Sequence, residues 1–334
     1  MTKNIVILCD GTGNKIGGDE RTNIVDMLQG LENSENQFVF YDMGVGTQSG
    51  ARFPLASKIS MTLKKATGFG VRENIREAYR LLMDHYEEGD QVFLMGFSRG
   101  AYTARLIAGL VMKVGLLRPG NSQLVDAATN LYFDKAPETE VEAFKRVATR
   151  DCPIHFVGVF DTVASMAIPY KFDFFSDKLL HPKIHHGIHA VAIDERRGKF
   201  PANLWDLTRE KSDGRIEQVW FAGVHSDVGG WYKDRGLSAI ALLWMLKHAR
   251  NAGMLLKQSF IEEVEALADP KGSQHTSYTL RWKFLPPFFP KHREIPEKAR
   301  VHDSVRVRRA ASDVDYDPPN LPRDSSLHYV SDPQ

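Results

Sequence analysis

The sequence predicts an α/β fold, in which helices cover both faces of a mostly parallel sheet. Short apolar runs alternate along the chain with longer segments of helical period. The short runs are apolar at successive positions and rich in Val, Ile and Phe, as expected for strands that are buried on both faces. The 334 residues are 43% hydrophobic and 25% charged, which is ordinary for a packed globular protein and excludes a disordered chain or a coiled coil.

Five segments are predicted to be strands, namely 4–9, 37–42, 91–96, 154–160 and 218–223. Helices are predicted over 70–88, 99–114 and 237–252. The first of these has one apolar stripe, because its apolar residues recur at steps of three and four. The other two are apolar nearly all round, so we expect them to be buried.

The remaining segments are predicted to be insertions and a tail. Residues 116–150 form a helical insertion with helices at 121–134 and 138–149, and residues 165–190 form a second insertion. Prolines recur after residue 285, so residues 285–334 are expected to wrap the surface as an extended Pro-rich tail. No Gly/Ser linker divides the chain, and we expect residues 1–334 to form a single domain.

Charge and cysteine content restrict the partners. Lys plus Arg number 43 and Asp plus Glu 42, so a net charge of +1 gives no global field for binding nucleic acid. Cys9 and Cys152 lie in apolar stretches and are expected to be buried, reduced thiols. No apolar run reaches the length of a membrane span, and no secretory signal is visible. The sequence therefore predicts a cytoplasmic protein. Export by a route that does not read an N-terminal signal stays open, and so does the oligomeric state.

The strongest local motif is GFSRGA at residues 96–101. It lies between a predicted strand and a predicted helix, which is the context that gives the G-x-S-x-G pattern its meaning. Ser98 would occupy a sharp, strained turn that exposes its hydroxyl, and the flanking glycines would permit close packing. The amide of Arg99, at the start of the helix, would stabilise an oxyanion. We therefore predict that Ser98 is a nucleophile.

A nucleophilic serine needs a histidine base and a carboxylate to orient it. Asp161 follows the predicted strand 154–160, and His225 follows the predicted strand 218–223 beside several glycines. Carboxyl ends of parallel strands meet at one edge of a sheet, and the order Ser, Asp, His is that of α/β hydrolases. His302 is the reserve candidate for the base. Asp227 is too close in sequence to His225 to orient it and is expected to shape the loop.

The first predicted strand ends in CDGTGN at residues 9–14. In this architecture the loop after it supplies a second oxyanion donor, and the amides of Gly11 and Thr12 are the candidates. Asp10 is a candidate for substrate contact or for support of this loop. Asp-Gly-Thr also occurs in aspartyl-phosphate phosphatases, but Leu8 stands where a partner acid of Asp10 would be expected. No G-K-[ST] follows, so a P-loop is excluded as well.

Two other clusters carry weaker signals. His185 and His189 would share one face of a helix, as metal ligands do, but no third ligand stands nearby, so neither a metal nor a cofactor is predicted. The basic run 306–309 is interpreted as a solvated edge, with peripheral contact to lipid headgroups as the alternative. The aromatic segments 166–175 and 284–289 are interpreted as an acyl-pocket wall or lid, or else as core.

In combination these motifs resemble a family of uncharacterised α/β hydrolase domains that includes the catalytic domain of type VI secretion phospholipase effectors. The resemblance is carried by residues 9–14, 96–101, 158–163 and 223–230, with further similar blocks at 189–197, 302–305 and 316–322. It implies an esterase with Ser98, Asp161 and His225 as its triad. Some members of the family act on phospholipids, but those effectors are usually much longer than this chain.

The sequence thus predicts a hydrolase of carboxylic esters that forms an acyl-enzyme on Ser98, with a small-molecule or lipid ester as substrate. Two alternatives remain. One is a non-catalytic scaffold protein that keeps the fold, and the other is an acyltransferase that uses the same triad. The acyl chain and the leaving group are left open.

Overall fold

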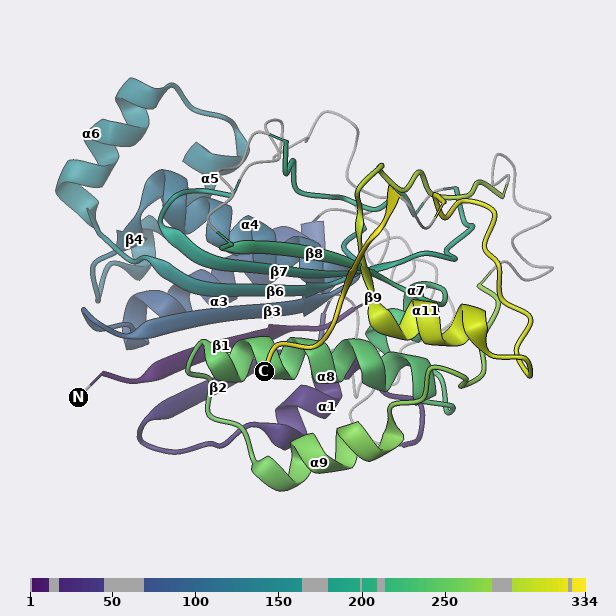
Figure 1. Ribbon diagram of the computed structural model, residues 1–334. Coiled ribbons are helices and arrows are strands. Elements are labelled where there is room, and N and C mark those ends of the chain that lie inside the picture. Colours follow the sequence, from purple (N-terminus) through teal and green to yellow (C-terminus); the bar gives the residue numbers. More distant parts are fainter. Residues whose placement is uncertain are drawn as a thin grey trace, which may run out of the picture.

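The computed structural model describes residues 2–11, 18–44, 69–163, 180–198, 200–208, 214–277, 290–323 and 326–334. Within these residues eight strands form one sheet, in the order β10-β9-β8-β7-β6-β3-β1-β2 (Figure 1). Every strand pair in it is parallel. The mostly parallel sheet predicted from the sequence is therefore confirmed.

The predicted strands agree closely with those observed. Three have the predicted bounds, and the ends of β3 and β8 differ by one or two residues. The strands are β1 (Asn4–Cys9), β2 (Gln37–Asp42), β3 (Gln91–Phe97), β6 (Ile154–Phe160), β7 (Ile184–Ala192), β8 (Ile216–Phe221), β9 (Arg300–His302) and β10 (His328–Val330).

Strand β7 was not predicted, and the proposal of a helical histidine pair there is wrong. His185 and His189 lie on an extended strand, so a spacing of four residues separates them instead of bringing them together. His189 is fully buried, with Nδ1 3.1 Å from Gln218 Oε1 and Nε2 accepting from the Thr162 amide. His185, His186 and buried His189 interrupt the apolar pattern of this strand.

Helices cover both faces of the sheet, and each face has its own apolar core (Figure 1). The first face packs against α3 (Phe69–His85), α4 (Arg99–Val114), α5 (Val125–Phe133) and α6 (Glu138–Ala148). The second face packs against α1 (Asn23–Gly30), α8 (Gly236–Asn251) and α9 (Gln258–Leu267). Helix α4 has its predicted bounds, while α1 and α9 were not predicted.

Helices α5 and α6, with the short 3-10 turn η1 (Ser122–Leu124), form the predicted helical insertion. The insertion is closed at its base by β4 (Leu116–Leu117), which pairs antiparallel with β5 (Thr149–Arg150). It lies at the amino ends of the strands, away from the loops that follow their carboxyl ends (Figure 1).

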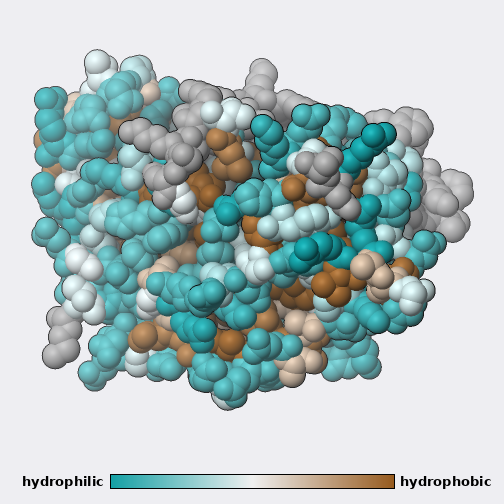
Figure 2. Space-filling view, in the orientation of Figure 1, coloured by the Kyte–Doolittle hydropathy of each residue, from teal (hydrophilic) through white to brown (hydrophobic). Residues whose placement is uncertain are grey.

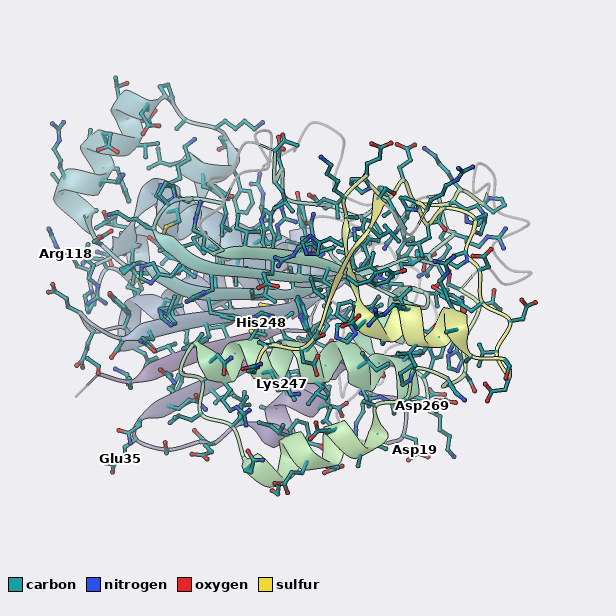
Figure 3. All side chains as sticks on the ribbon, in the orientation of Figure 1. Asp19, Glu35, Arg118, Lys247, His248 and Asp269 are labelled. Carbon is teal, nitrogen blue, oxygen red and sulfur yellow. The ribbon has the colours of Figure 1, made fainter. Side chains whose placement is uncertain are left out.

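The C-terminal segment is more regular than predicted. Besides β9 and β10, which extend the sheet, its described residues contain helix α11 (Asp303–Ala310). The apolar face of this segment packs on the sheet edge through a third cluster that includes Trp220, Val301 and Val305. Lys247 on α8 is labelled in Figure 3, and its Nζ donates to Asp332 near the C-terminus at 3.0 Å. The expectation of an extended tail without regular elements is therefore wrong for this part.

The sheet has a topological switch point between β1 and β3. From β1 the chain passes to β2 on one side, and from β3 it continues to β6 on the other. At such a switch point the loops after the two strands diverge, and ligands bind in the crevice that they leave. The loop after β1 and the Ser98 turn both lie here.

The surface and the cysteines agree with a packed globular molecule. Figure 2 shows a face made mainly of hydrophilic residues with scattered hydrophobic patches. Cys9 and Cys152 are buried free thiols, as predicted. In the described part of the chain, no helix has both the length and the hydropathy required to span a bilayer.

The structure does not describe the aromatic segments 166–175 and 284–289 or most of the insertion 165–190.

Candidate active site

Ser98 occupies a strained turn between β3 and α4. Its φ of 58° and ψ of −119° lie where L-residues are rarely found. The turn also requires glycines, because a Cβ on Gly96 would lie 2.5 Å from the carbonyl oxygen of Gly100. A Cβ on Gly100 would lie 2.0 Å from the carbonyl oxygen of Cys9. The strand, turn and helix thus hold the Ser98 hydroxyl above the edge of the sheet.

His225 lies between Ser98 and Asp161. Its Nε2 is 2.8 Å from Ser98 Oγ, and its Nδ1 is 2.5 Å from Asp161 Oδ2. With the proton on Nδ1, the ring donates to the carboxylate and accepts from the serine hydroxyl. The rings of Phe97 and Phe200 pack against the imidazole at 4.7 and 5.5 Å between centroids. The structure therefore brings together the three side chains that the sequence singles out.

Asp161 is fully buried and has partners on both oxygens besides His225. Arg293 donates from Nη1 to Oδ1 at 2.5 Å and from Nη2 to Oδ2 at 3.0 Å. The Ala192 amide donates to Oδ1 at 2.9 Å. Burial alone would raise the pKa of Asp161, but the Arg293 charge and the hydrogen bond from His225 hold it well below its ordinary value. Asp161 is therefore a fixed carboxylate.

Three carboxylates hold the loop that carries His225. The consecutive amides of residues 223, 224 and 225 donate to three different side chains. Asp194 accepts from the first at 2.6 Å, Asp227 from the second at 2.9 Å and Glu195 from the third at 3.3 Å. Because the backbone is bonded at three successive residues, the position of the imidazole is set by side chains after β7 and within α7 (His225–Gly229).

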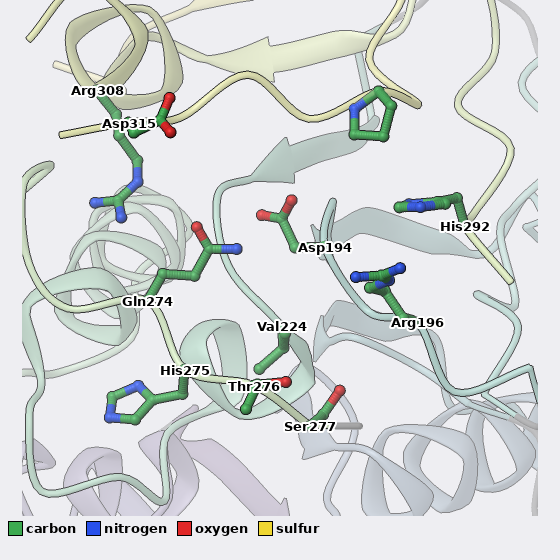
Figure 4. Close-up of a pocket in the computed structure, with 11 residues that line it drawn as sticks. Asp194, Arg196, Val224, Gln274, His275, Thr276, Ser277, His292, Arg308 and Asp315 are labelled. Carbon is green, nitrogen blue, oxygen red and sulfur yellow. The ribbon is translucent and has the colours of Figure 1, made fainter. Parts of the chain in front are cut away.

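Each of these carboxylates is held in turn by a residue from the C-terminal part of the chain. Of this network, Figure 4 labels Asp194, His275 and Ser277. The Tyr316 hydroxyl donates to Asp194 at 2.9 Å, and the Ser277 hydroxyl donates to Glu195 at 2.9 Å. His275 Nδ1 lies 2.7 Å from Asp227 Oδ1. Side chains of this network line a cavity of about 540 Å³ that adjoins the His225 loop.

The ionisation of the three carboxylates differs with their partners. Burial raises the pKa of Asp194 to about 6, and burial also raises the pKa of Asp227. Burial would raise the pKa of Glu195 too, but the Arg197 guanidinium lies 2.9 Å from it, and that pairing lowers the pKa below its ordinary value.

The loop after β1 is arranged differently from the prediction. Asp10 is buried, and its carboxylate accepts from Thr22 and Tyr41 at 2.8 Å each. The Gly11 amide donates to Asp10 Oδ1 at 2.6 Å. The prediction that Gly11 donates to an oxyanion therefore does not fit this geometry, because its N–H is already directed at a carboxylate. Thr12 lies outside the described residues.

Two predicted candidates lie elsewhere. His302 is 3.0 Å from Asp332 through Nε2 and stacks on Phe221, so it fastens the C-terminal segment and does not contact Ser98. In the basic run 306–309, Arg308 is buried and donates to the Pro270 and Gly272 carbonyls at 2.8 Å. The run is therefore not the fully solvated edge that the sequence suggested.

Arg293, Tyr316, Ser277 and His275 were not predicted as site residues. No catalytic motif marks them, because each acts through contacts with residues that are far away in the sequence. Within the residues that the structure describes, no group of three His, Cys, Asp or Glu side chains is arranged to hold a metal ion.

The parallel sheet, the strained serine and the histidine between Ser98 and Asp161 are the arrangement of an α/β hydrolase. Residues 3–248 match the family model described as "T6SS, Phospholipase effector Tle1-like, catalytic domain", so the chain belongs to this family. The resemblance predicted from the sequence is thereby confirmed. Arg293 and the other C-terminal contacts lie beyond the matched residues.

Known proteins similar to this chain include one curated relative and two solved structures. The uncharacterized protein YEL023C of Saccharomyces cerevisiae is 35% identical over 218 residues, which are 59% of this chain and 32% of that protein. The chain thus spans about a third of the length of this relative.

The structure of the Tle1 effector bound to the VgrG spike from the type 6 secretion system is similar with a TM-score of 0.50 and 16% identity, over 98% of this chain and 94% of that one. An uncharacterized protein from Pseudomonas aeruginosa has a TM-score of 0.46 and 18% identity, over 80% of this chain and 49% of that one. At these identities the likeness concerns the fold alone.

Proposed function

We propose that this protein hydrolyses carboxylic esters, with a lipid ester as its substrate class. The observation that carries the proposal is the position of the His225 ring, 2.8 Å from Ser98 Oγ and 2.5 Å from Asp161. Membership in a family named for phospholipase effectors supports a lipid substrate.

The reaction would proceed through an acyl-enzyme. His225 Nε2 takes the proton of Ser98 as the hydroxyl oxygen attacks the ester carbonyl carbon, and Asp161 stabilises the imidazolium. The tetrahedral intermediate collapses, and the leaving alkoxide takes the proton from His225 as an alcohol. A water molecule then gives its proton to His225 and attacks the acyl carbon, which releases the acid and restores the Ser98 hydroxyl.

The oxyanion would be stabilised at the start of α4. In the proposal the Arg99 amide, at the first residue of this helix, is one donor and the Thr12 amide is the other. Each such donor contributes about 3 kcal/mol to lowering the barrier. Asp10 would support the second donor, because it holds the neighbouring Gly11 amide and ties the loop to Thr22 and Tyr41.

The test is an acyl series comprising a short chromogenic ester, a long-chain ester and phospholipid vesicles. The Ser98→Ala variant should lose at least about 10³-fold in kcat with an unchanged melting temperature. Exposed Ser312 provides the control Ser312→Ala, which should keep full activity.

Activity that survives in Ser98→Ala would contradict the proposal. Wild-type protein inactive on every ester would point to a scaffold, and an acylated product formed with added alcohols or amines would indicate acyl transfer.

A further inference from the structure

Arg293 makes the most extensive contacts of any C-terminal residue described at this site. Besides its two bonds to Asp161, its guanidinium donates to the Ala192 carbonyl at 2.9 Å and to the Phe200 carbonyl at 2.9 Å. The residue is 7% exposed. Its backbone is fixed as well, because Asn320 donates to the Arg293 carbonyl at 3.1 Å. A planar, bidentate pairing of this kind fixes both the position and the rotation of a carboxylate.

We propose that Arg293 is a positioning residue of this site. It keeps the Asp161 carboxylate oriented toward His225, and it lowers the affinity of the Asp161–His225 pair for a proton. The proposal rests on the proposed function, because it assigns His225 as the base. A carboxylate shared between a guanidinium and an imidazole attracts the imidazolium proton less strongly than an unshared carboxylate does. Only an imidazole without the added proton can accept from the Ser98 hydroxyl.

Other charged groups face the pair from neighbouring elements. Glu195 accepts from the His225 amide and pairs with Arg197, and Asp227 of α7 pairs with His275. His189 of β7, which accepts from the amide of Thr162 next to Asp161, is kept neutral, because burial lowers its pKa to about 3. Among the described residues, Arg293 is the only Lys or Arg in direct contact with Asp161.

Replacing Arg293 should therefore change the pH dependence and not only the stability. In Arg293→Gln the acidic limb of the kcat/KM profile, which reports deprotonation of the base, should move to higher pH by roughly one unit. At pH 7 kcat should fall about tenfold, while KM should change little. Arg293→Lys keeps the charge but loses the bidentate geometry, so its acidic limb should stay near that of the wild type while kcat remains reduced.

Arg308 provides a matched control. It is 4% exposed and also lies in the C-terminal segment, but its guanidinium donates to the Pro270 and Gly272 carbonyl groups and not to a carboxylate. Arg308→Gln should lower the melting temperature without moving the pH profile. If Arg293→Gln behaves in the same way as Arg308→Gln, its role is structural only and the proposal is overturned.

A second measurement separates this proposal from the proposed function. NMR titration of the imidazole resonances, with His225 assigned through His225→Gln, follows protonation of the ring whether or not the protein turns over an ester. The ring should take up its proton at higher pH in Arg293→Gln than in the wild type. An unchanged titration would contradict the proposal for Arg293. Absence of ester hydrolysis together with a shifted titration would contradict only the proposed function.

Discussion

The two sides of the candidate site are built in different ways. On the serine side, β1, β3 and α4 place Ser98 through backbone packing, with glycines where two chain segments meet. On the histidine side, His225 and Asp161 are held by side chains, several of which come from the C-terminal part of the chain. Local backbone geometry thus fixes the position of a nucleophile at a tight turn. The position of its base depends on contacts between segments that are distant in the sequence.

The largest effect is expected on the serine side. In Gly100→Ala the new Cβ would lie 2.0 Å from the backbone oxygen of Cys9, which cannot move without disturbing β1. The free energy of unfolding should fall by about 3 kcal/mol or more, as measured by urea denaturation.

The control for this change is Gly120→Ala, since a Cβ there meets no atom within 4 Å. Its φ of +81° should cost only about 1 kcal/mol. Equal losses in the two variants would show that the serine side is not set by backbone packing.

On the histidine side, Tyr316→Phe should have a smaller effect. It removes one hydrogen bond to Asp194 and leaves the ring in place, so the free energy of unfolding should fall by about 1–2 kcal/mol. Calorimetry would check this against Tyr86→Phe, which changes a buried tyrosine on the other face of the sheet whose hydroxyl bonds to no described residue. A loss no greater than that of the control would mean that Tyr316 does not support the His225 loop.

The sequence predicts the serine side well because its signals are local. The motif at residues 96–101, the strands before and after it and the bounds of α4 all follow from the spacing of glycines and apolar residues. Asp161 and His225 are also predictable, because each follows an apolar strand. Arg293 could not be predicted, since its role depends on where the C-terminal segment crosses the sheet edge. Strand β7 was missed because three histidines interrupt its apolar pattern, and a single sequence does not show that one of them, His189, is hydrogen-bonded in the interior.

The smallest effect concerns the titration of Asp194. The folded protein holds a proton on Asp194 up to about pH 6, whereas the unfolded chain releases it near pH 4. Between these values the folded state binds more protons, so this group makes the protein less stable as the pH rises through the interval.

Asp194→Asn cannot titrate and should lack this decrease. The drop in the free energy of unfolding between pH 4 and pH 7 should become smaller by about 1–2 kcal/mol. Urea denaturation at a series of pH values measures the difference. Parallel curves for wild type and variant would show that burial does not perturb Asp194.

The most direct test of the whole account is covalent labelling with a fluorophosphonate, followed by peptide mass spectrometry. A serine hydroxyl reacts only where a neighbouring base withdraws its proton. The account predicts one adduct, on the peptide that contains Ser98, and its loss when His225 is replaced by Ala. An unlabelled wild-type protein, or an adduct that persists unchanged without His225, would contradict it.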